Sequence, residues 1–326
     1  MPNLLVTLEA DAPSRTVIER TVGTGVSVVY LSDLAADDRA AALAAADVVL
    51  ARNTAKELRP GELATIAKAR LFQFVTAGID YVPLKDFPPQ AHIASNGGAH
   101  AEPMAEHALA MALAALKRLF VEHEKLKRRD FDQFRPNRML AGATVGIVGF
   151  GGIGVATARL MRAAGAKVHA INRRGASDEP VDWIGTNADL DRLLAGADIV
   201  LLSVPLTPAT NGLIGERELG LMKPDAILIN LARGEVVDEA ALFAHLEANP
   251  AFTACIDAWW IEPVRHGRFD MGHDFMSLPN VIASPHNSAS VTGWRQISLA
   301  RAVENACVAL KGGTPDHLVP PADRMQ

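Results

Sequence analysis

The chain has 326 residues, of which 49% are hydrophobic and 21% charged, as in an ordinary globular protein. This length allows two domains of normal size, each with its own core. The net charge of −5 gives no reason to expect a nucleic-acid partner, and no basic block or long apolar run predicts membrane binding.

Cysteine use and the N-terminus suggest a reducing compartment. Cys255 and Cys307 both lie within apolar runs, which favours buried thiols over a disulfide. The N-terminus lacks a basic region followed by a long apolar one, and Glu9 and Asp11 interrupt it early. We therefore expect a cytoplasmic protein.

The first 95 residues or so alternate strand-like and helix-like runs. Strands are expected at 4–8, 26–31, 48–51, 71–75 and 93–94, with alanine-rich amphipathic helices such as 35–46 and 61–69 between them. Strands that alternate with helices predict a parallel sheet covered on both faces.

One long helix is expected next, over residues 101–129. Pro103 suits a first helical turn, and an apolar face recurs at helical spacing through Ala105, Leu109, Ala112, Leu113 and Leu116. A helix of this length could link two domains.

A glycine-rich stretch follows and organises the rest of the chain. The apolar strand 144–148 leads into Gly149, Gly151 and Gly154, which have G-x-G-x-x-G spacing. They open a helix from about 152 to 164, and a second strand follows at 167–171. This arrangement predicts a dinucleotide fold, in which a pyrophosphate lies against free N–H groups at a helix start, including those near Gly152 and Ile153.

The residue after the second strand helps to choose the dinucleotide. An NAD site usually has Asp or Glu there to accept hydrogen bonds from the ribose hydroxyls. Here the position holds Asn172, followed by Arg173 and Arg174. Asn does not repel a 2′-phosphate and guanidinium groups can bind one, which favours NADP(H) over NAD(H). The alternative is a solvated basic turn.

Beyond residue 174 the α/β rhythm continues. Strands are expected at 199–203, 226–230, 253–256 and 281–283, helices near Asp189, Glu216 and Asp238, and a last helix over 291–311 that returns to the first domain. Ligands of such sheets bind beyond the carboxyl ends of the strands.

Three residues of suitable chemistry follow strand ends: Arg233, Glu262 and His286. Hydride transfer to a 2-oxo acid needs an acid/base, and His is the usual choice. A carboxylate beside that His orients the ring and stabilises its charged form, and a guanidinium can clamp the substrate carboxylate. Taken singly, each residue has a structural alternative, as a surface ion pair, a loop residue or a capping histidine.

The combination resembles the D-2-hydroxy-acid dehydrogenase family. Residues 226–242, 257–263, 205–210 and 278–286 match its motifs in the family order. The resemblance covers nearly the whole chain and is most specific between residues 99 and 289. It implies two doubly wound α/β domains: a Rossmann dinucleotide-binding domain, 99–289, inserted into a flavodoxin-like substrate-binding domain, 1–98 and 290–326. It also implies a substrate cleft between them and a homodimer.

The resemblance also implies residue roles. Arg233 would bind the substrate carboxylate, and His286, paired with Glu262, would be the acid/base. In the first domain, backbone N–H groups near Ala77 and Gly78 would meet the substrate carboxylate, and His100 would face the substrate. The remaining cofactor contacts expected are Met104, Ser203, Val204, Pro205, Thr210, Leu231, Ala232 and Asp257, the last beside the nicotinamide carboxamide.

Some positions depart from the family pattern. His100 stands where Asn is common, and Ser203 where His is common. The segment 264–277 is longer than expected and is either a substrate-shaping loop or a polar surface excursion. Its His266 and His273, with nearby Asp270 and Asp274, lack a recognised metal spacing, so we expect no metal.

The predicted reaction is NADPH-dependent reduction of glyoxylate, hydroxypyruvate or a related 2-oxo acid. Formate- and phosphite-oxidising dehydrogenases share the architecture, although Glu262 stands where Gln would favour formate. The fold also resembles co-repressors that sense dinucleotides without catalysis. A methyltransferase could share the glycine loop, but it would leave Arg233, Glu262 and His286 without a role.

Overall fold

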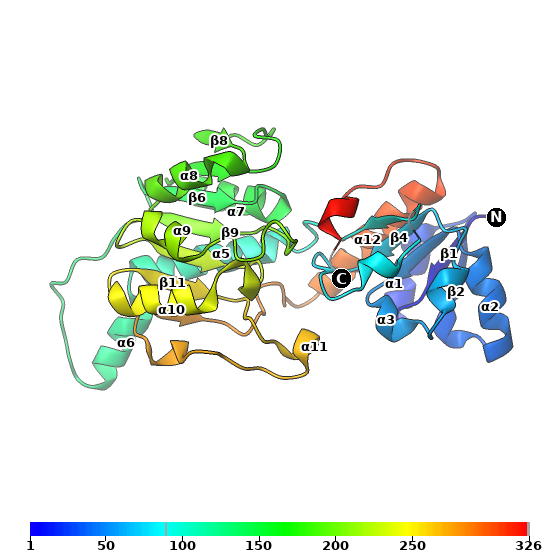
Figure 1. The fold of residues 1–326 in the computed structure, drawn as a ribbon, viewed down its shortest axis with the longest axis horizontal. Helices are drawn as coiled ribbons and strands as arrows, with labels where there is room; N and C mark the ends of the chain where they lie inside the picture. The colour runs from blue at the N-terminus through cyan, green and yellow to red at the C-terminus, as the bar shows by residue number, and fades with distance from the viewer. Residues whose placement is uncertain (89, 325–326) are drawn as a thin grey trace. The chain divides into compact units, whose positions relative to one another are not determined.

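Two parallel β-sheets form the frame of the protein (Figure 1). The structure, a computed structural model, describes residues 1–88 and 90–324. The chain divides into unit 1, Met1–His100 with Val291–Gln326, and unit 2, Ala101–Ser290. These boundaries lie within two residues of the predicted domain limits.

The sheet of unit 1 has the strand order β2-β1-β3-β4-β5, with every pair parallel. This is the flavodoxin-like order. Its strands are β1 (Asn3–Val6), β2 (Ser27–Tyr30), β3 (Val48–Ala51), β4 (Leu71–Phe74) and β5 (His92–Ala94). Its helices are α1 (Ala12–Val22), α2 (Ala36–Ala45), α3 (Thr54–Glu57), α4 (Glu62–Thr65) and α12 (Trp294–Leu310).

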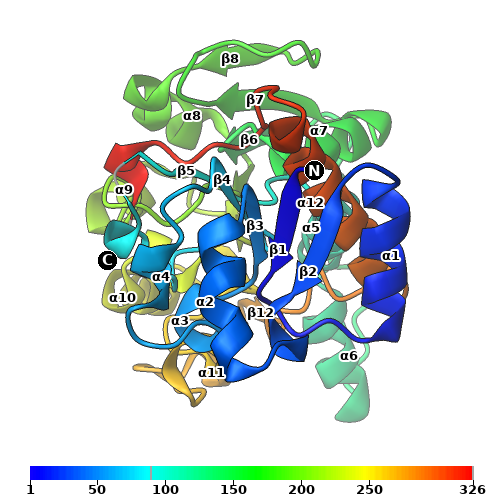
Figure 2. The ribbon, with the colours of Figure 1, turned by 90° about the vertical axis from the view of Figure 1, so that its right-hand side faces the viewer.

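Side-chain alternation gives this sheet two apolar faces. Leu4 and Val48 pack into a core with α1 and α12, whereas Leu5 and Val49 pack into another with α2. Figure 2 shows α1 and α2 flanking the strands. Because α12 covers one face, the last part of the chain completes the unit that the first part begins.

The sheet of unit 2 has the order β12-β11-β10-β9-β6-β7-β8, again wholly parallel. Its strands are β6 (Thr144–Val148), β7 (Lys167–Ile171), β8 (Trp183–Gly185), β9 (Ile199–Leu202), β10 (Ile227–Asn230), β11 (Thr253–Ile256) and β12 (Val281–Ala283). The chain runs outward from β6 in both directions, so a switch point lies between β6 and β9. Dinucleotides bind at such a point in Rossmann folds.

Helices cover this sheet as the α/β alternation predicts. They are α5 (Ala101–Leu116), α6 (Leu119–Lys127), α7 (Gly152–Ala163), α8 (Leu190–Gly196), α9 (Glu216–Leu221), α10 (Glu239–Ala248) and α11 (Pro263–His266). Helix α5 buries Met111 and Ala112 in one core with Ile147 and Leu201 of the sheet. Cys255 lies in the same core, and both cysteines are free and buried.

The prediction of one helix over residues 101–129 is wrong. The helix breaks between α5 and α6, where Arg118 takes a left-handed backbone with φ of 53°. The Lys117 ammonium donates a hydrogen bond to the Arg138 carbonyl at 2.7 Å, which holds the break. Neither Gly nor Pro marks this position, so the local sequence gives no sign of it.

Strand predictions agree with the structure to within two residues at their ends, and β3, β6, β7, β11 and β12 agree at both ends. Neither α1 nor the short edge strand β8 is among the elements expected from the sequence. Among the described residues, no helix is long and apolar enough to cross a membrane.

Candidate active site

The loop between β6 and α7 leaves its backbone open. Gly151 is the N-cap of α7, and no side chain caps the helix there. A Cβ on Gly151 would meet no atom within 4 Å, whereas a Cβ on Gly154 would lie 2.5 Å from the Gly149 carbonyl oxygen. Open space therefore lies next to uncapped helix N–H groups, which fits the pyrophosphate of a dinucleotide.

The end of β9 is tied to this loop. Ser203 Oγ donates to the Gly149 carbonyl at 2.8 Å, and Gly149 has a φ of 98°. A Cβ on Gly149 would lie 2.8 Å from the Val204 side chain. Farther along, Thr210 Oγ1 donates to the Pro205 carbonyl at 2.7 Å. Ser203 and Thr210 thus shape the backbone of their own loops.

After β7, the side chain of Asn172 is used within its own turn. Its Nδ2 donates to the Ala176 carbonyl at 2.9 Å, and its Oδ1 accepts from the Arg174 N–H at 3.0 Å. Arg173 and Arg174 are exposed. The three residues after β7 therefore carry two guanidinium groups and no carboxylate.

Asn230, the last residue of β10, builds the turn that carries Arg233. Its Oδ1 accepts from the Ala232 N–H at 3.0 Å, and its Nδ2 donates to the Arg233 carbonyl at 2.9 Å. The Arg233 guanidinium donates to the Ala232 carbonyl at 2.8 Å. Leu231 and Ala232 are both buried.

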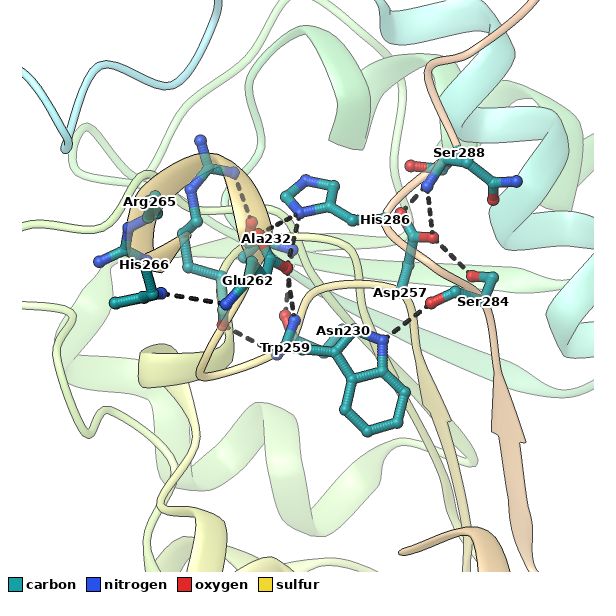
Figure 3. Close-up of polar contacts among 12 residues, drawn as sticks. Asn230, Ala232, Asp257, Trp259, Glu262, Arg265, His266, Ser284, His286 and Ser288 are labelled. Carbon is teal, nitrogen blue, oxygen red and sulfur yellow. Dashed lines mark hydrogen bonds and ion pairs between the residues drawn. The ribbon is translucent and has the colours of Figure 1, made fainter. Parts of the chain in front are cut away.

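Glu262 and His286, from the ends of β11 and β12, are in direct contact (Figure 3). Both carboxylate oxygens of Glu262 lie 2.8 Å from His286 Nδ1. The Trp259 N–H also donates to Glu262 Oε1, at 2.7 Å. The glutamate side chain is 9% exposed and the histidine side chain 33%. The pair is therefore a buried carboxylate that orients an imidazole open to solvent.

Two opposing influences act on Glu262. Burial raises the pKa of its carboxyl group, but hydrogen bonds from His286 and the Trp259 N–H, with the charges of His286 and Arg233, outweigh burial. The pKa of Glu262 therefore lies below its ordinary value of 4.5. The influence of Arg233 places its charge near the pair.

His286 itself has a left-handed backbone, with φ of 50°. The two N–H groups that follow it, of Asn287 and Ser288, point to the carboxylate of Asp257, at 3.1 and 3.4 Å. Asp257 is fully buried. The Asp257 carboxylate therefore holds the turn that contains His286 through two backbone N–H groups.

The remaining predicted residues lie elsewhere. Ala77 and Gly78 are in unit 1, in a half-buried loop after β4 that Asn96 supports through the Val75 and Thr76 carbonyls. His100 is the last residue of that stretch of unit 1, and burial lowers the pKa of its imidazole. Their substrate contacts stay predictions. Met104 packs into the core of unit 2.

The segment 264–277 is attached to unit 2 at several points. Arg265 pairs with Glu235 at 2.6 Å, and the Gly272 N–H donates to Glu239 at 2.7 Å. The buried Phe275 ring stacks on Trp260 with centroids 5.3 Å apart. The segment therefore packs against α10 and against the loops that follow β10 and β11. Among the described residues, no group of three His, Cys, Asp or Glu could hold a metal ion.

Sequence reasoning missed several residues that shape the site. Asn230 was detectable, because it is a polar residue at the end of an apolar run. His107 and Ser284 could not be detected, because they are hydrogen-bonded to each other across 177 positions of the chain. His266 could not be detected either, because its contact depends on a local turn. His266 Nδ1 accepts from the Glu262 N–H at 3.0 Å.

Comparison with known proteins agrees with this geometry. Residues 109–288 match the family described as "D-isomer specific 2-hydroxyacid dehydrogenase, NAD binding domain". Glyoxylate/hydroxypyruvate reductase B of Pectobacterium carotovorum subsp. carotovorum is 34% identical over 227 residues, which cover 68% of this chain and 69% of that protein.

Two further relatives extend the comparison. Glyoxylate reductase of Thermococcus gammatolerans is 38% identical over 179 residues, 55% of this chain and 52% of that protein, so the alignment spans about half of that relative. A solved structure from Pyrobaculum aerophilum, provisionally described as a formate dehydrogenase, is 28% identical with a TM-score of 0.81 and covers 100% of both chains.

The fold and the site define a doubly wound α/β oxidoreductase that uses a nicotinamide dinucleotide. The chain belongs to the D-isomer-specific 2-hydroxyacid dehydrogenase family, and it is an NAD(P)-dependent enzyme of that class. The predicted fold class and family are therefore confirmed.

Proposed function

We propose that this enzyme reduces a small 2-oxo acid of the glyoxylate or hydroxypyruvate type, with NADPH as the preferred cofactor. The contact of Glu262 with His286, at 2.8 Å, carries the proposal. It lies at the carboxyl edge of a sheet where β12, β11, β10, β9 and β6 are consecutive, so Arg233 and the glycine loop share that edge. The names of the reductases in Pectobacterium and Thermococcus support the substrate class.

In the proposed reaction, the carbonyl carbon gains a hydride and the carbonyl oxygen gains a proton. His286 gives the proton from Nε2, because Nδ1 faces Glu262. Glu262 fixes the ring and stabilises its charged form before the proton is given. The Arg233 guanidinium binds the substrate carboxylate and polarises the carbonyl.

The residues that hold the dinucleotide belong to unit 2. The glycine loop, the turn after β7, the loop after β9 and the backbone at Leu231 and Ala232 would bind it, and the bound nicotinamide supplies the hydride. Asp257 would meet the carboxamide. In unit 1, the loop at Ala77 and Gly78 and the His100 side chain would add contacts to the substrate.

The preference for NADPH rests on the turn after β7. Asn172 already has two partners within its turn, and the exposed Arg173 and Arg174 can bind a 2′-phosphate bidentately. Replacing both arginines by Ala should raise the KM for NADPH at least about tenfold and leave the KM for NADH nearly unchanged. An equal change for both cofactors would contradict the preference.

The experiment that tests the function is a spectrophotometric screen of NADPH and NADH oxidation against a panel of 2-oxo acids. Reduction of NADP⁺ and NAD⁺ with formate or phosphite is measured in parallel. We expect the highest kcat/KM for glyoxylate or hydroxypyruvate with NADPH. Turnover of formate or phosphite alone would replace the proposed substrate class. Binding of the dinucleotide without any turnover would favour a sensing protein.

A homodimer belongs to the same proposal. Large apolar side chains are exposed on α6 and the segment after it, as expected of a partner surface: Leu119, Phe120, Leu126, Phe131, Phe134 and Met139. Light scattering after size exclusion should give twice the chain mass of 34.7 kDa. A monomer at micromolar concentration would contradict this part.

A further inference from the structure

A hydrogen-bond chain links helix α5 to the turn of His286. His107 Nε2 lies 3.0 Å from Ser284 Oγ, and Ser284 Oγ donates to Asp257 Oδ1 at 2.5 Å. Asp257 is fully buried and receives the N–H groups of Asn287 and Ser288. Figure 3 shows Ser284 beside Asp257, with the backbone of Ser288 on the other side of the carboxylate.

The direction of this chain follows from the donors available. A carboxylate accepts only, so the one hydroxyl proton of Ser284 goes to Asp257. The Ser284 oxygen must then accept from His107, which therefore carries its proton on Nε2. His107 Nε2 also lies 3.9 Å from Asp257 Oδ1, too far for a direct bond. Ser284 is thus the necessary link.

The backbone of Ser284 is held in place independently of the hydrogen-bond chain through its hydroxyl. Its N–H donates to the Ile256 carbonyl at 2.9 Å, and its own carbonyl accepts from Trp259 Nε1 at 2.9 Å. Ser284 is therefore a fixed point next to β11 and β12. From this point the hydroxyl can set the rotamer of the Asp257 carboxylate.

The carboxylate in turn determines a strained turn. His286 has a φ of 50°, a left-handed conformation that is unfavourable for a residue with a Cβ. Two consecutive N–H groups directed at one buried carboxylate compensate for this cost. If the carboxylate rotates, the hydrogen bonds from the Asn287 and Ser288 N–H groups weaken, and the His286 imidazole is no longer held in one orientation.

We propose that His107 and Ser284 are positioning residues of this active site. They hold the Asp257 carboxylate, which holds the turn that aims His286 at the substrate. The kinetic consequence rests on the function proposed above, whereas the structural consequence does not. Among the described residues, neither His107 nor Ser284 forms a hydrogen bond with Glu262 or His286, so we infer that their influence runs through the backbone at 286–288.

The kinetic test uses variants that separate the hydrogen bond from the bulk of the side chain. His107→Leu and Ser284→Ala remove the chain, and His107→Gln and Ser284→Thr keep a donor and a hydroxyl. We expect kcat to fall about tenfold in the first pair, with the KM for the 2-oxo acid changed less than about threefold. The second pair should stay within about threefold of wild type, as should His92→Leu, at an exposed histidine of β5.

A double-mutant cycle separates one chain from two independent effects. Because His107 acts only through Ser284, the double variant His107→Leu/Ser284→Ala should lose no more kcat than Ser284→Ala alone. Losses that multiply would overturn the proposal, as would unchanged kcat in Ser284→Ala. If His107→Leu does not fold, Ser284→Ala, which is the smaller substitution, still tests the proposal.

Amide hydrogen exchange gives a readout that does not need turnover. The N–H groups of Asn287 and Ser288 should exchange slowly in the wild type and several-fold faster in Ser284→Ala and His107→Leu, with His107→Gln close to wild type. Equal exchange in all variants would overturn the positioning role. Absence of wild-type turnover would instead overturn the proposed function and leave this result to decide the positioning alone.

Discussion

At the scale of single residues, the proposed acid/base consists of two groups, the buried Glu262 carboxylate and the partly exposed His286 imidazole. The carboxylate has donors on both oxygens, which hold it against the ring. The imidazole keeps Nε2 free of that contact, as the proposed proton delivery requires. The proposed mechanism therefore needs both side chains.

Replacement of His286 by Ala should separate chemistry from binding. We expect kcat for 2-oxo acid reduction to fall about 10²- to 10⁴-fold, because the proton donor is lost. Dissociation constants for NADPH, measured by fluorescence titration, should change little. His92→Ala, at an exposed histidine of β5, serves as the control, and a variant of His286 with wild-type kcat would remove this residue from the mechanism.

The lowered pKa of Glu262 predicts a pH dependence of stability. The group binds its proton more weakly in the folded protein than in the unfolded chain, so it stabilises the fold above its ordinary pKa of 4.5. This contribution is lost as pH falls through the lower pKa of the folded state.

The expected result is a difference between wild type and Glu262→Gln. On acidification from pH 6 to 3, the free energy of unfolding of the wild type should fall more than that of the variant, because only the wild type loses the stabilising contribution of the Glu262 carboxylate. Urea denaturation at a series of pH values measures both. Parallel curves would show that the carboxylate has the same pKa in both states.

At the scale of elements, two positions at the junction of β6 and α7 require glycine for different structural reasons. Gly154 lets the helix approach the strand, because a Cβ there would lie 2.5 Å from the Gly149 carbonyl oxygen. Gly151 has no such neighbour. Gly154 is therefore required by the fold, and Gly151 leaves room for a ligand.

A pair of alanine variants tests this division. Gly154→Ala should lower the free energy of unfolding by about 1–3 kcal/mol through overpacking. Gly151→Ala should leave the stability of the cofactor-free enzyme within about 0.5 kcal/mol and raise the KM for NADPH. Thermal unfolding and initial-rate kinetics are the two measurements, and a reversed pattern would refute the assignment.

Most elements followed from sequence because their signals are local, whereas the pairing of Glu262 with His286 was implied by the family resemblance. The glycine spacing, the apolar strands and the polar residues after β10, β11 and β12 can be read within about ten positions. The break at Arg118 has no local signal, and the edge strand β8 lacks an apolar run, since it reads Trp-Ile-Gly between polar neighbours. The link from His107 to Ser284 joins residues 177 positions apart, so only the folded chain reveals it.

At the scale of the whole molecule, unit 2 is formed by one continuous stretch with its own sheet and core. A fragment of residues 101–290 should therefore fold alone and bind NADPH. Far-UV circular dichroism, and quenching of Trp183, Trp259 and Trp260 by the cofactor, would show it. A fragment that is unfolded, or folded without affinity for NADPH, would contradict this expectation.

Unit 1 has a different history during synthesis, because α12 must return to complete it. The ribosome makes the 190 residues from 101 to 290 before α12 appears, and at about 5–20 residues per second this takes roughly 10–40 s. For that interval, the face of β3 and β4 that α12 later covers lacks this helix, and only α1 is already present in the same core. The nascent protein therefore exposes an apolar surface on which a chaperone can bind, until the last helix displaces it.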